Sequence, residues 1–180
     1  MLSEVPIPLK AYEDFFAQHS SFHVDGFDFP VGKPDAKGYY NAQFFGKNRH
    51  LGEDWNAVTG GNSDLGQPIY SIGHAYVYSA KEEGPGWGKV VRLIHYHPRL
   101  KPAYVESLYA HCDSLWVEEG DSVKRGDQIA TIGNADGRYL AHLHLEMRDS
   151  LEMPIGGGYG RQTAGYLIPT NFINSYRNLP

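Results

Sequence analysis

Several features common in other protein classes are scarce in this chain. Among 180 residues Cys112 is the only cysteine, so no internal disulfide can form. The 16 lysines and arginines are outnumbered by 21 acidic residues, giving a net charge of −5 with no basic cluster. This balance argues against binding nucleic acid or an anionic membrane surface. No apolar run approaches the roughly 20 residues of a membrane span.

Residues 1–10 also lack a signal peptide, because no basic start is followed by an apolar stretch. Either the protein is cytoplasmic, or the chain is a mature or engineered fragment whose signal was removed. The sequence does not choose between these.

What the chain does contain predicts a turn-rich β protein. Its 21 glycines and 11 prolines indicate many turns, and its 13 tyrosines and 8 phenylalanines suit strands. A hydrophobic fraction of 41% is ordinary for a folded protein, and 180 residues suffice for one domain with short extensions.

Short runs rich in Val, Ile and Tyr, punctuated by Gly, Pro, Asp or Asn, predict strands from residue 67 onward. The runs cover residues 68–72, 75–79, 89–96, 103–110, 115–117, 128–132 and 142–147. Their close spacing favours antiparallel pairing. Short helices are predicted over residues 8–19 and 172–177, and residues 22–49 are predicted as extended segments and loops.

His142 and His144 lie in an alternating stretch, so on a strand both imidazoles and Glu146 project from one face. Leu143, Leu145 and Met147 then enter the core. Two imidazoles on one side suit a zinc site, where one ligates and the other faces substrate. The alternative is a strand whose polar residues face solvent, and the pair alone does not decide.

Two further elements carry chemistry-bearing side chains. His50 and Asp54 are good zinc ligands spaced by four, although Gly52 favours a turn or loop there, and a solvated loop is the alternative. His111 ends a predicted strand, where it either acts as an acid/base and stabilises charge or is merely structural. His95 and His97 repeat the two-residue spacing and form a competing metal pair.

In order along the chain, His50-x-Gly52-x-Asp54, Leu108-Tyr109-Ala110-His111 and His142-Leu143-His144 resemble the three signatures of the M23, or LytM-type, metallopeptidases. The resemblance extends over about residues 49–148. It implies a mainly β fold, in which an antiparallel sheet carries a substrate groove and short helices lie at the termini. Residues 1–48 would pack on the core as a helix and extended segment, residues 49–149 would form the peptidase core, and residues 150–180 a loop and short helix.

By this resemblance His50, Asp54 and His144 hold Zn²⁺, while His111 and His142 are catalytic. His95 matches a position with a supporting role. The implied activity is hydrolysis of peptide bonds in peptidoglycan stems or cross-links through a metal-activated water, and the implied location is periplasmic or extracellular. Glu146 is predicted either to orient a ligand histidine or to form an exposed or structural ion pair.

The resemblance leaves alternatives and departures open. A catalytically silent relative that binds the wall or regulates another hydrolase is one alternative, and a zinc peptidase with a non-wall substrate is another. Residues 60–65 form an extra loop predicted to shape or restrict the groove. His74 is predicted to be exposed, and Cys112 to be a small buried hydrophobe. Residues 154–160 are either a groove-side loop or a connector.

Overall fold

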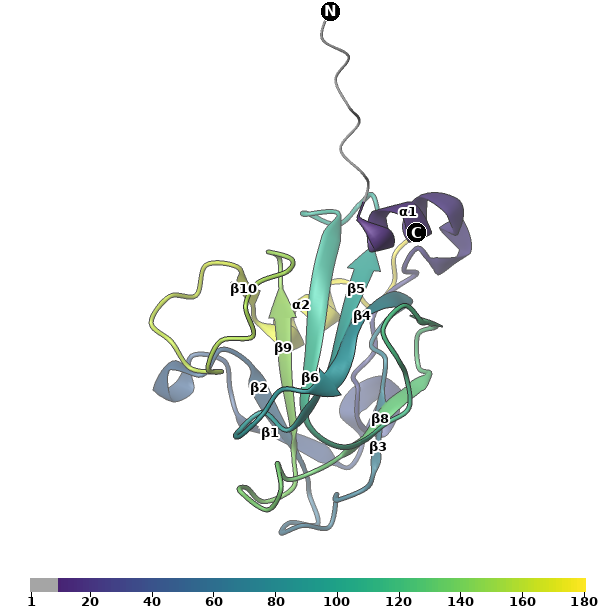
Figure 1. Cartoon of the computed structure of the whole chain (residues 1–180). Coiled ribbons are helices and arrows are strands. Elements are labelled where there is room, and N and C mark those ends of the chain that lie inside the picture. Colours follow the sequence, from purple (N-terminus) through teal and green to yellow (C-terminus); the bar gives the residue numbers. More distant parts are fainter. Residues whose placement is uncertain (1–9) are drawn as a thin grey trace, which may run out of the picture.

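The computed structural model describes residues 10–180, in which ten strands form one mainly antiparallel sheet flanked by short helices (Figure 1). In chain order the elements are α1 (Ala11–Gln18), η1 (Ser20–Phe22), η2 (Gly32–Ala36), β1 (Tyr39–Gln43), η3 (Lys47–Arg49), β2 (Glu53–Ala57), β3 (Pro68–Tyr70), β4 (Ala75–Glu82), β5 (Lys89–Tyr96), β6 (Tyr104–Leu115), β7 (Ser122–Val123), β8 (Gln128–Ile132), β9 (Leu143–Arg148), β10 (Tyr166–Leu167) and α2 (Pro169–Ser175).

The main path of the sheet runs β1-β2-β9-β6-β5-β4-β7, and every pair is antiparallel. β10 pairs with β9, and β8 joins β3 to β6. β9 therefore lies between β2 and β6, although β2 is about 90 residues away along the chain. The predicted fold class, mainly β and antiparallel with short helices near the ends, is confirmed.

The central strand β9 separates two environments. Leu143, Leu145 and Met147 point into the main hydrophobic core, which α2 covers through Phe172 and Ile173. The alternate residues of β9 face the opposite side, because successive side chains of a strand point in opposite directions. There His144 lies opposite Asp54 of β2 and Ala110 of β6. This register brings residues from three strands together.

Most of the predicted strands exist, but two predictions were wrong. Residues 115–117 form no separate strand, because β6 continues through Leu115. The stretch after Gly52 is not a loop, since Glu53–Ala57 is β2, held between β1 and β9. Pairing with distant strands, rather than local residue preference, makes this short segment extended.

The terminal helices occur close to the predicted places. α1 occupies Ala11–Gln18, while residues 8 and 9 of the predicted helix lie outside the described part of the chain. α2 begins at Pro169, which suits the first turn because its missing N–H needs no partner there. Among residues 10–180, no helix is both long and apolar enough to cross a membrane.

Candidate metal and catalytic site

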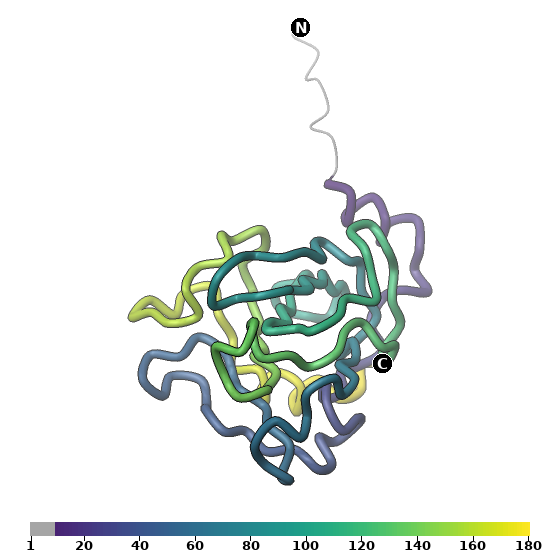
Figure 2. The backbone as a smooth tube through the Cα atoms, turned by 60° about the horizontal axis from the view of Figure 1, so that its bottom comes forward, coloured from purple at the N-terminus to yellow at the C-terminus, as the bar shows by residue number. Residues whose placement is uncertain are grey.

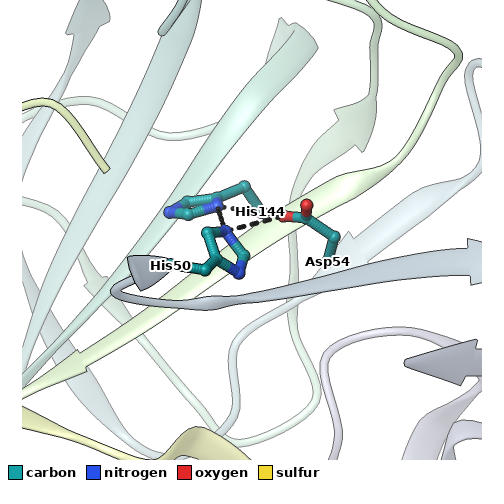
Figure 3. A group of neighbouring side chains, drawn as sticks. All are labelled: His50, Asp54 and His144. Atoms are coloured by element: carbon teal, nitrogen blue, oxygen red, sulfur yellow. Dashed lines mark hydrogen bonds and ion pairs between the residues drawn. The ribbon is translucent and has the colours of Figure 1, made fainter. Parts of the chain in front are cut away.

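Three side chains predicted as ligands converge where β2 meets β9 (Figure 3). His50 follows the tight turn η3, in which Asn48 and Arg49 have positive φ angles, and Asp54 lies on β2. His144 lies on β9. His50 and His144 are almost fully buried, and Asp54 is half-buried.

The distances between the donor atoms fit a tetrahedral metal ion. His50 Nε2 lies 2.9 Å from His144 Nδ1 and 3.3 Å from Asp54 Oδ1, and His144 Nδ1 lies 3.0 Å from Asp54 Oδ1. Ligands about 2.0–2.1 Å from a tetrahedral zinc are about 3.3 Å apart. Two imidazoles and a carboxylate are ligand types that zinc accepts, so this donor set fits the ion. Among residues 10–180, no other histidine, cysteine and carboxylate cluster of three has this convergence.

Position 52, between His50 and Asp54, requires a glycine because the chain there passes very close to β9. A Cβ placed at Gly52 would lie 2.6 Å from the Leu145 carbonyl oxygen and 2.8 Å from His144 Cε1. Both distances are shorter than real Cβ contacts. The His50–Asp54 segment can therefore approach β9 this closely only without a side chain at Gly52.

Hydrogen bonds among these groups shift their pKa values in opposite directions. Burial opposes ionisation of Asp54, but His144 and His50 outweigh it and lower the pKa of the carboxyl well below its usual range. Burial also disfavours the charged form of His144. Its hydrogen bonds with Asp54 and Glu146 outweigh burial and raise the pKa to about 9. Without a metal, a proton therefore occupies this site at neutral pH.

The second ring nitrogen of His144, Nε2, is held by a hydrogen bond on the side away from Asp54 and His50. His144 Nε2 donates to Glu146 Oε1 at 3.1 Å, which leaves Nδ1 as the atom facing Asp54 and His50. Glu146 also accepts hydrogen bonds from Arg148 at 2.6 and 2.9 Å, and both residues are fully buried. Both predicted roles of Glu146, orienting the histidine and forming an ion pair, therefore occur, but the carboxylate is not exposed. By contrast, His50 Nδ1 is buried without a hydrogen-bond partner among residues 10–180.

His111 and His142 lie beside the three donors, and each has its Nδ1 against a backbone carbonyl. His111 Nδ1 donates to the Trp87 carbonyl at 3.1 Å, and His142 Nδ1 donates to the Leu140 carbonyl at 2.8 Å. Because a carbonyl can only accept, the neutral form of each ring carries its proton on Nδ1 and leaves Nε2 as an acceptor. Their ring centres are 4.8 Å apart, and His142 Nε2 lies 3.8 Å from Asp54 Oδ1.

The surroundings keep His111 neutral. Burial lowers its pKa, the neighbouring His144 and His142 lower it further, and the result is about 3. His111 also has a φ of +63° and lies within β6, at a place where the pairing with β5 is irregular. The prediction that it ends a strand was wrong, because the strand continues past it with an irregular register.

These side chains open onto one cavity of about 570 Å³. Asp54, His111, His142 and His144 line it, so four of the five predicted site residues share one space. The rims carry aromatic rings, namely Trp87, Tyr139 and Tyr159. His50 lies beneath, with its ring 5.0 Å from that of Tyr159.

One wall of this cavity is formed by residues 156–159, the last part of a segment, residues 153–159, that follows β9. Its carbonyl groups accept hydrogen bonds from buried or rim side chains: Met153 O from Arg92, Ile155 O from Arg148 and Gly156 O from Trp87 Nε1, each at 2.9 Å. The other end is tied by Leu51 N–H, which donates to the Gly158 carbonyl at 2.9 Å. Figure 2 shows this yellow-green segment and the blue segment before β2 on the same side of the molecule. The segment is thus on the groove side, one of the two predicted alternatives.

Other predictions have mixed outcomes. His95 is fully buried outside the cavity, where Nδ1 donates to the His74 carbonyl and Nε2 lies 2.7 Å from Ser107 Oγ. Among residues 10–180, His95 and His97 do not form a metal-binding cluster. His74 is half-buried rather than exposed, because its Nδ1 accepts from the Arg125 amide. Cys112 is buried, and burial raises its pKa to about 12, as expected of a small hydrophobe.

The extra loop at residues 60–65 does not line the cavity. It instead folds back on β2 and on the backbone just before β9. Asp64 accepts a hydrogen bond from the Ala57 amide, and Asn62 accepts one from the Ala141 amide. These contacts had no signal in local sequence, since they join residues that only the fold brings together.

Comparison with known proteins agrees with this geometry. The model of peptidase family M23 matches residues 48–155. The chain is 30% identical over 100 residues to the uncharacterized lipoprotein YgeR of Escherichia coli, an alignment covering 52% of this chain and 37% of YgeR. It is 32% identical over 102 residues to the murein hydrolase activator NlpD of Salmonella dublin, covering 53% and 25% respectively.

Lysostaphin from Staphylococcus simulans, described as an antimicrobial peptidase, has a similar fold, with a TM-score of 0.57 and 20% identity over 77% of this chain and 50% of that one. The chain thus spans about a third and a quarter of the two curated relatives, and half of the solved structure. The family model covers more than half of the chain, including all five of the predicted site residues. The chain therefore belongs to peptidase family M23.

Proposed function

We propose that the chain is a zinc-dependent endopeptidase that hydrolyses peptide bonds in peptidoglycan stems or cross-links. The observation that carries this proposal is the arrangement of the cavity. Three donor atoms at tetrahedral separations lie beside two further histidines, each of which donates from Nδ1 to a backbone carbonyl and so has Nε2 as its acceptor atom when the ring is neutral. A domain that only binds a ligand needs no such pair of bases next to a metal site.

In this proposal His50, Asp54 and His144 hold zinc through Nε2, Oδ1 and Nδ1. When bound, zinc supplies a Lewis acid and lowers the pKa of its water toward about 7. Glu146 fixes the tautomer of His144, so that Nδ1 keeps its lone pair for the metal. Displacement of the proton from His144 accompanies binding.

His142 and His111 handle protons and developing charge. With Nδ1–H held by the Leu140 carbonyl, His142 takes a proton from the attacking water at Nε2 and later delivers it to the leaving amine. His111 is kept neutral by burial, so its Nε2 accepts a hydrogen bond and can orient the attacking water toward the scissile carbonyl. His142, while it carries the water's proton, is an imidazolium that stabilises the developing oxyanion until the proton passes to the leaving amine.

The cavity wall supports a peptide rather than a bulky substrate. Residues 156–158 of this wall are all glycines and carry no side chains, and a Cβ at Gly157 would contact nothing within 4 Å. A backbone can therefore run along this wall, while the rings of Tyr139 and Tyr159 flank it. The proposed substrate implies a periplasmic or extracellular location, and YgeR is named a lipoprotein.

A second candidate function is activation of another wall hydrolase without catalysis. It is favoured by one observation, the 32% identity to a protein named murein hydrolase activator. A silent domain has no need to retain a complete donor set and both neighbouring histidines. All five residues are present in this chain, which supports the enzyme proposal over the activator.

Mass spectrometry of peptidoglycan digests distinguishes the two. Zinc-loaded protein should create new amine ends within stems or cross-links, and chelator-treated protein and His142→Ala should not. His97→Ala, a half-buried histidine outside the cavity, is the matched control and should cleave normally. Binding of peptidoglycan without cleavage, by protein that holds one zinc, would favour the activator.

A further inference from the structure

The backbone just before β9 is held by side chains rather than by a neighbouring strand. The β2–β9 ladder ends at the pair Trp55 and Leu143, one residue short of His142. On the β2 side, the peptide groups of Ala141 bond to two asparagines. Ala141 N–H donates to Asn62 Oδ1 at 2.8 Å, and Asn56 Nδ2 donates to the Ala141 carbonyl at 3.1 Å.

The two asparagines reach Ala141 from elements that are themselves fixed. Asn56 lies on β2, two residues after Asp54, so both side chains leave the strand on the same face. Asn62 lies in the loop of residues 60–66. That loop is tied down by buried Asp64, which accepts from Ala57 N–H at 2.9 Å, and by Gly66 N–H, which donates to the Ile132 carbonyl at 2.7 Å.

The peptide groups that they hold determine where His142 points. The Ala141 carbonyl belongs to the same peptide plane as the His142 nitrogen, so fixing it fixes the direction in which the His142 side chain leaves the backbone. On the other side His142 N–H makes one long bond, 3.2 Å, to the Gly133 carbonyl in an isolated bridge. Ala141 is fully buried, and so its peptide groups cannot turn to water without cost.

From this geometry we propose that Asn56 and Asn62 are positioning residues that clamp the backbone of Ala141 and so hold His142 at the cavity. The kinetic consequence rests on the proposed peptidase activity, whereas the clamp itself is a property of the folded chain. Neither asparagine lines the cavity or contacts the three donor atoms. They act on the reaction only through His142.

The two contacts have opposite polarity, which gives a stringent test. Asn62 accepts through its oxygen, so Asn62→Asp keeps the acceptor. Asn56 donates through its nitrogen, so Asn56→Asp loses the donor and sets a carboxylate against a carbonyl. Asn56→Ala and Asn62→Ala each remove one bond without adding charge. Ser63→Ala is the control, since Ser63 is exposed in the same loop and bonds to Thr59 rather than to Ala141.

The first measurement follows amide exchange at Ala141 and the tautomer of the His142 ring by NMR, in the whole protein loaded with zinc. In wild type we expect slow exchange at Ala141 and one tautomer with the proton on Nδ1. Asn62→Ala should speed that exchange about fivefold to tenfold, the effect of one neutral hydrogen bond. Asn62→Asp and Ser63→Ala should leave it slow, and Asn56→Ala and Asn56→Asp should mix the tautomers.

The second measurement compares kcat, KM and zinc affinity on peptidoglycan fragments. Asn56→Ala, Asn56→Asp and Asn62→Ala should lower kcat by about 10- to 100-fold, the range for a slightly misplaced catalytic group, with KM unchanged. Zinc affinity should not change in the alanine variants, because His142 is not among the donors. Asn62→Asp should retain kcat.

Unchanged Ala141 exchange in Asn62→Ala would overturn the clamp, as would equal losses in Asn62→Asp and Asn62→Ala. If the wild type cleaves nothing, the proposed function fails. The exchange rates and the ring tautomer still decide whether the clamp exists.

Discussion

Replacing Gly52 by alanine should disrupt the metal site without touching any of its donor atoms. The new Cβ would lie 2.6 Å from the Leu145 carbonyl oxygen, and 2.8 and 2.9 Å from two atoms of the His144 ring. Ordinary contacts begin near 3.4 Å, so the two segments must separate by about 0.6–0.8 Å at this point. The carbonyl belongs to the central strand β9, which cannot easily move.

The expected cost divides between folding and metal binding. Overpacking of this kind costs about 1–3 kcal/mol of folding stability. Displacement of the His144 ring from Asp54 and His50 should weaken zinc binding by about 10- to 100-fold, the range found when the support of a ligand is disturbed. Thermal unfolding of the metal-free protein measures the first, and competition with a chelator measures the second.

Gly157→Ala is the matched control. Gly157 lies in the cavity wall, where an added Cβ meets nothing within 4 Å. Its zinc affinity and melting temperature should equal those of wild type. If Gly52→Ala binds zinc as tightly as Gly157→Ala and is equally stable, the close approach of the two segments does not maintain the site.

Three further predictions follow from the buried charges. Glu146→Gln should weaken zinc binding about 10- to 100-fold and destabilise the fold by about 3 kcal/mol, because Arg148 loses the nearer of the two buried carboxylates that it faces, Glu146 and Glu106. Wild-type values in calorimetry and unfolding would contradict this. The pKa of His144 is raised to about 9 without metal, so zinc must displace a proton, and the affinity for zinc should fall about tenfold for each unit that the pH drops below that value. Equal zinc affinity at about pH 6 and 8 would refute this prediction. Burial lowers the pKa of His95 to about 4 from 6.5, so the unfolded state binds the proton first, and the free energy of unfolding should fall by about 3 kcal/mol as the pH drops through this window. In urea unfolding, His95→Gln should lose less of this stability over the same window. An identical loss would exclude His95 as the cause.

The arrangement of His142 and His144 was predictable because the two-residue period of a strand is a local property. Alternation placed Leu143 and Leu145 in the core, and the structure agrees. Their flanking histidines therefore had to face the other side. The family resemblance then joined them to His50, Asp54 and His111, which local pattern alone left as weak candidates.

The failures all involve contacts between distant segments. β2 was missed because its extended form depends on pairing with β1 and β9. His111 was predicted to end a strand, whereas it lies within β6, where the pairing with β5 is irregular. The need for Gly52 and the side-chain contacts to Ala141 involve residues about 80 to 90 apart, and no local period encodes such an approach.

The central claim assigns the metal to His50, Asp54 and His144, and proton transfer to His142 beside it. Measuring zinc content and peptidoglycan cleavage of His142→Ala and His144→Ala side by side tests this most directly. His142→Ala should keep one tightly bound zinc and lose most turnover, whereas His144→Ala should lose the zinc itself. Equal zinc affinity and equal activity in the two variants would contradict the account.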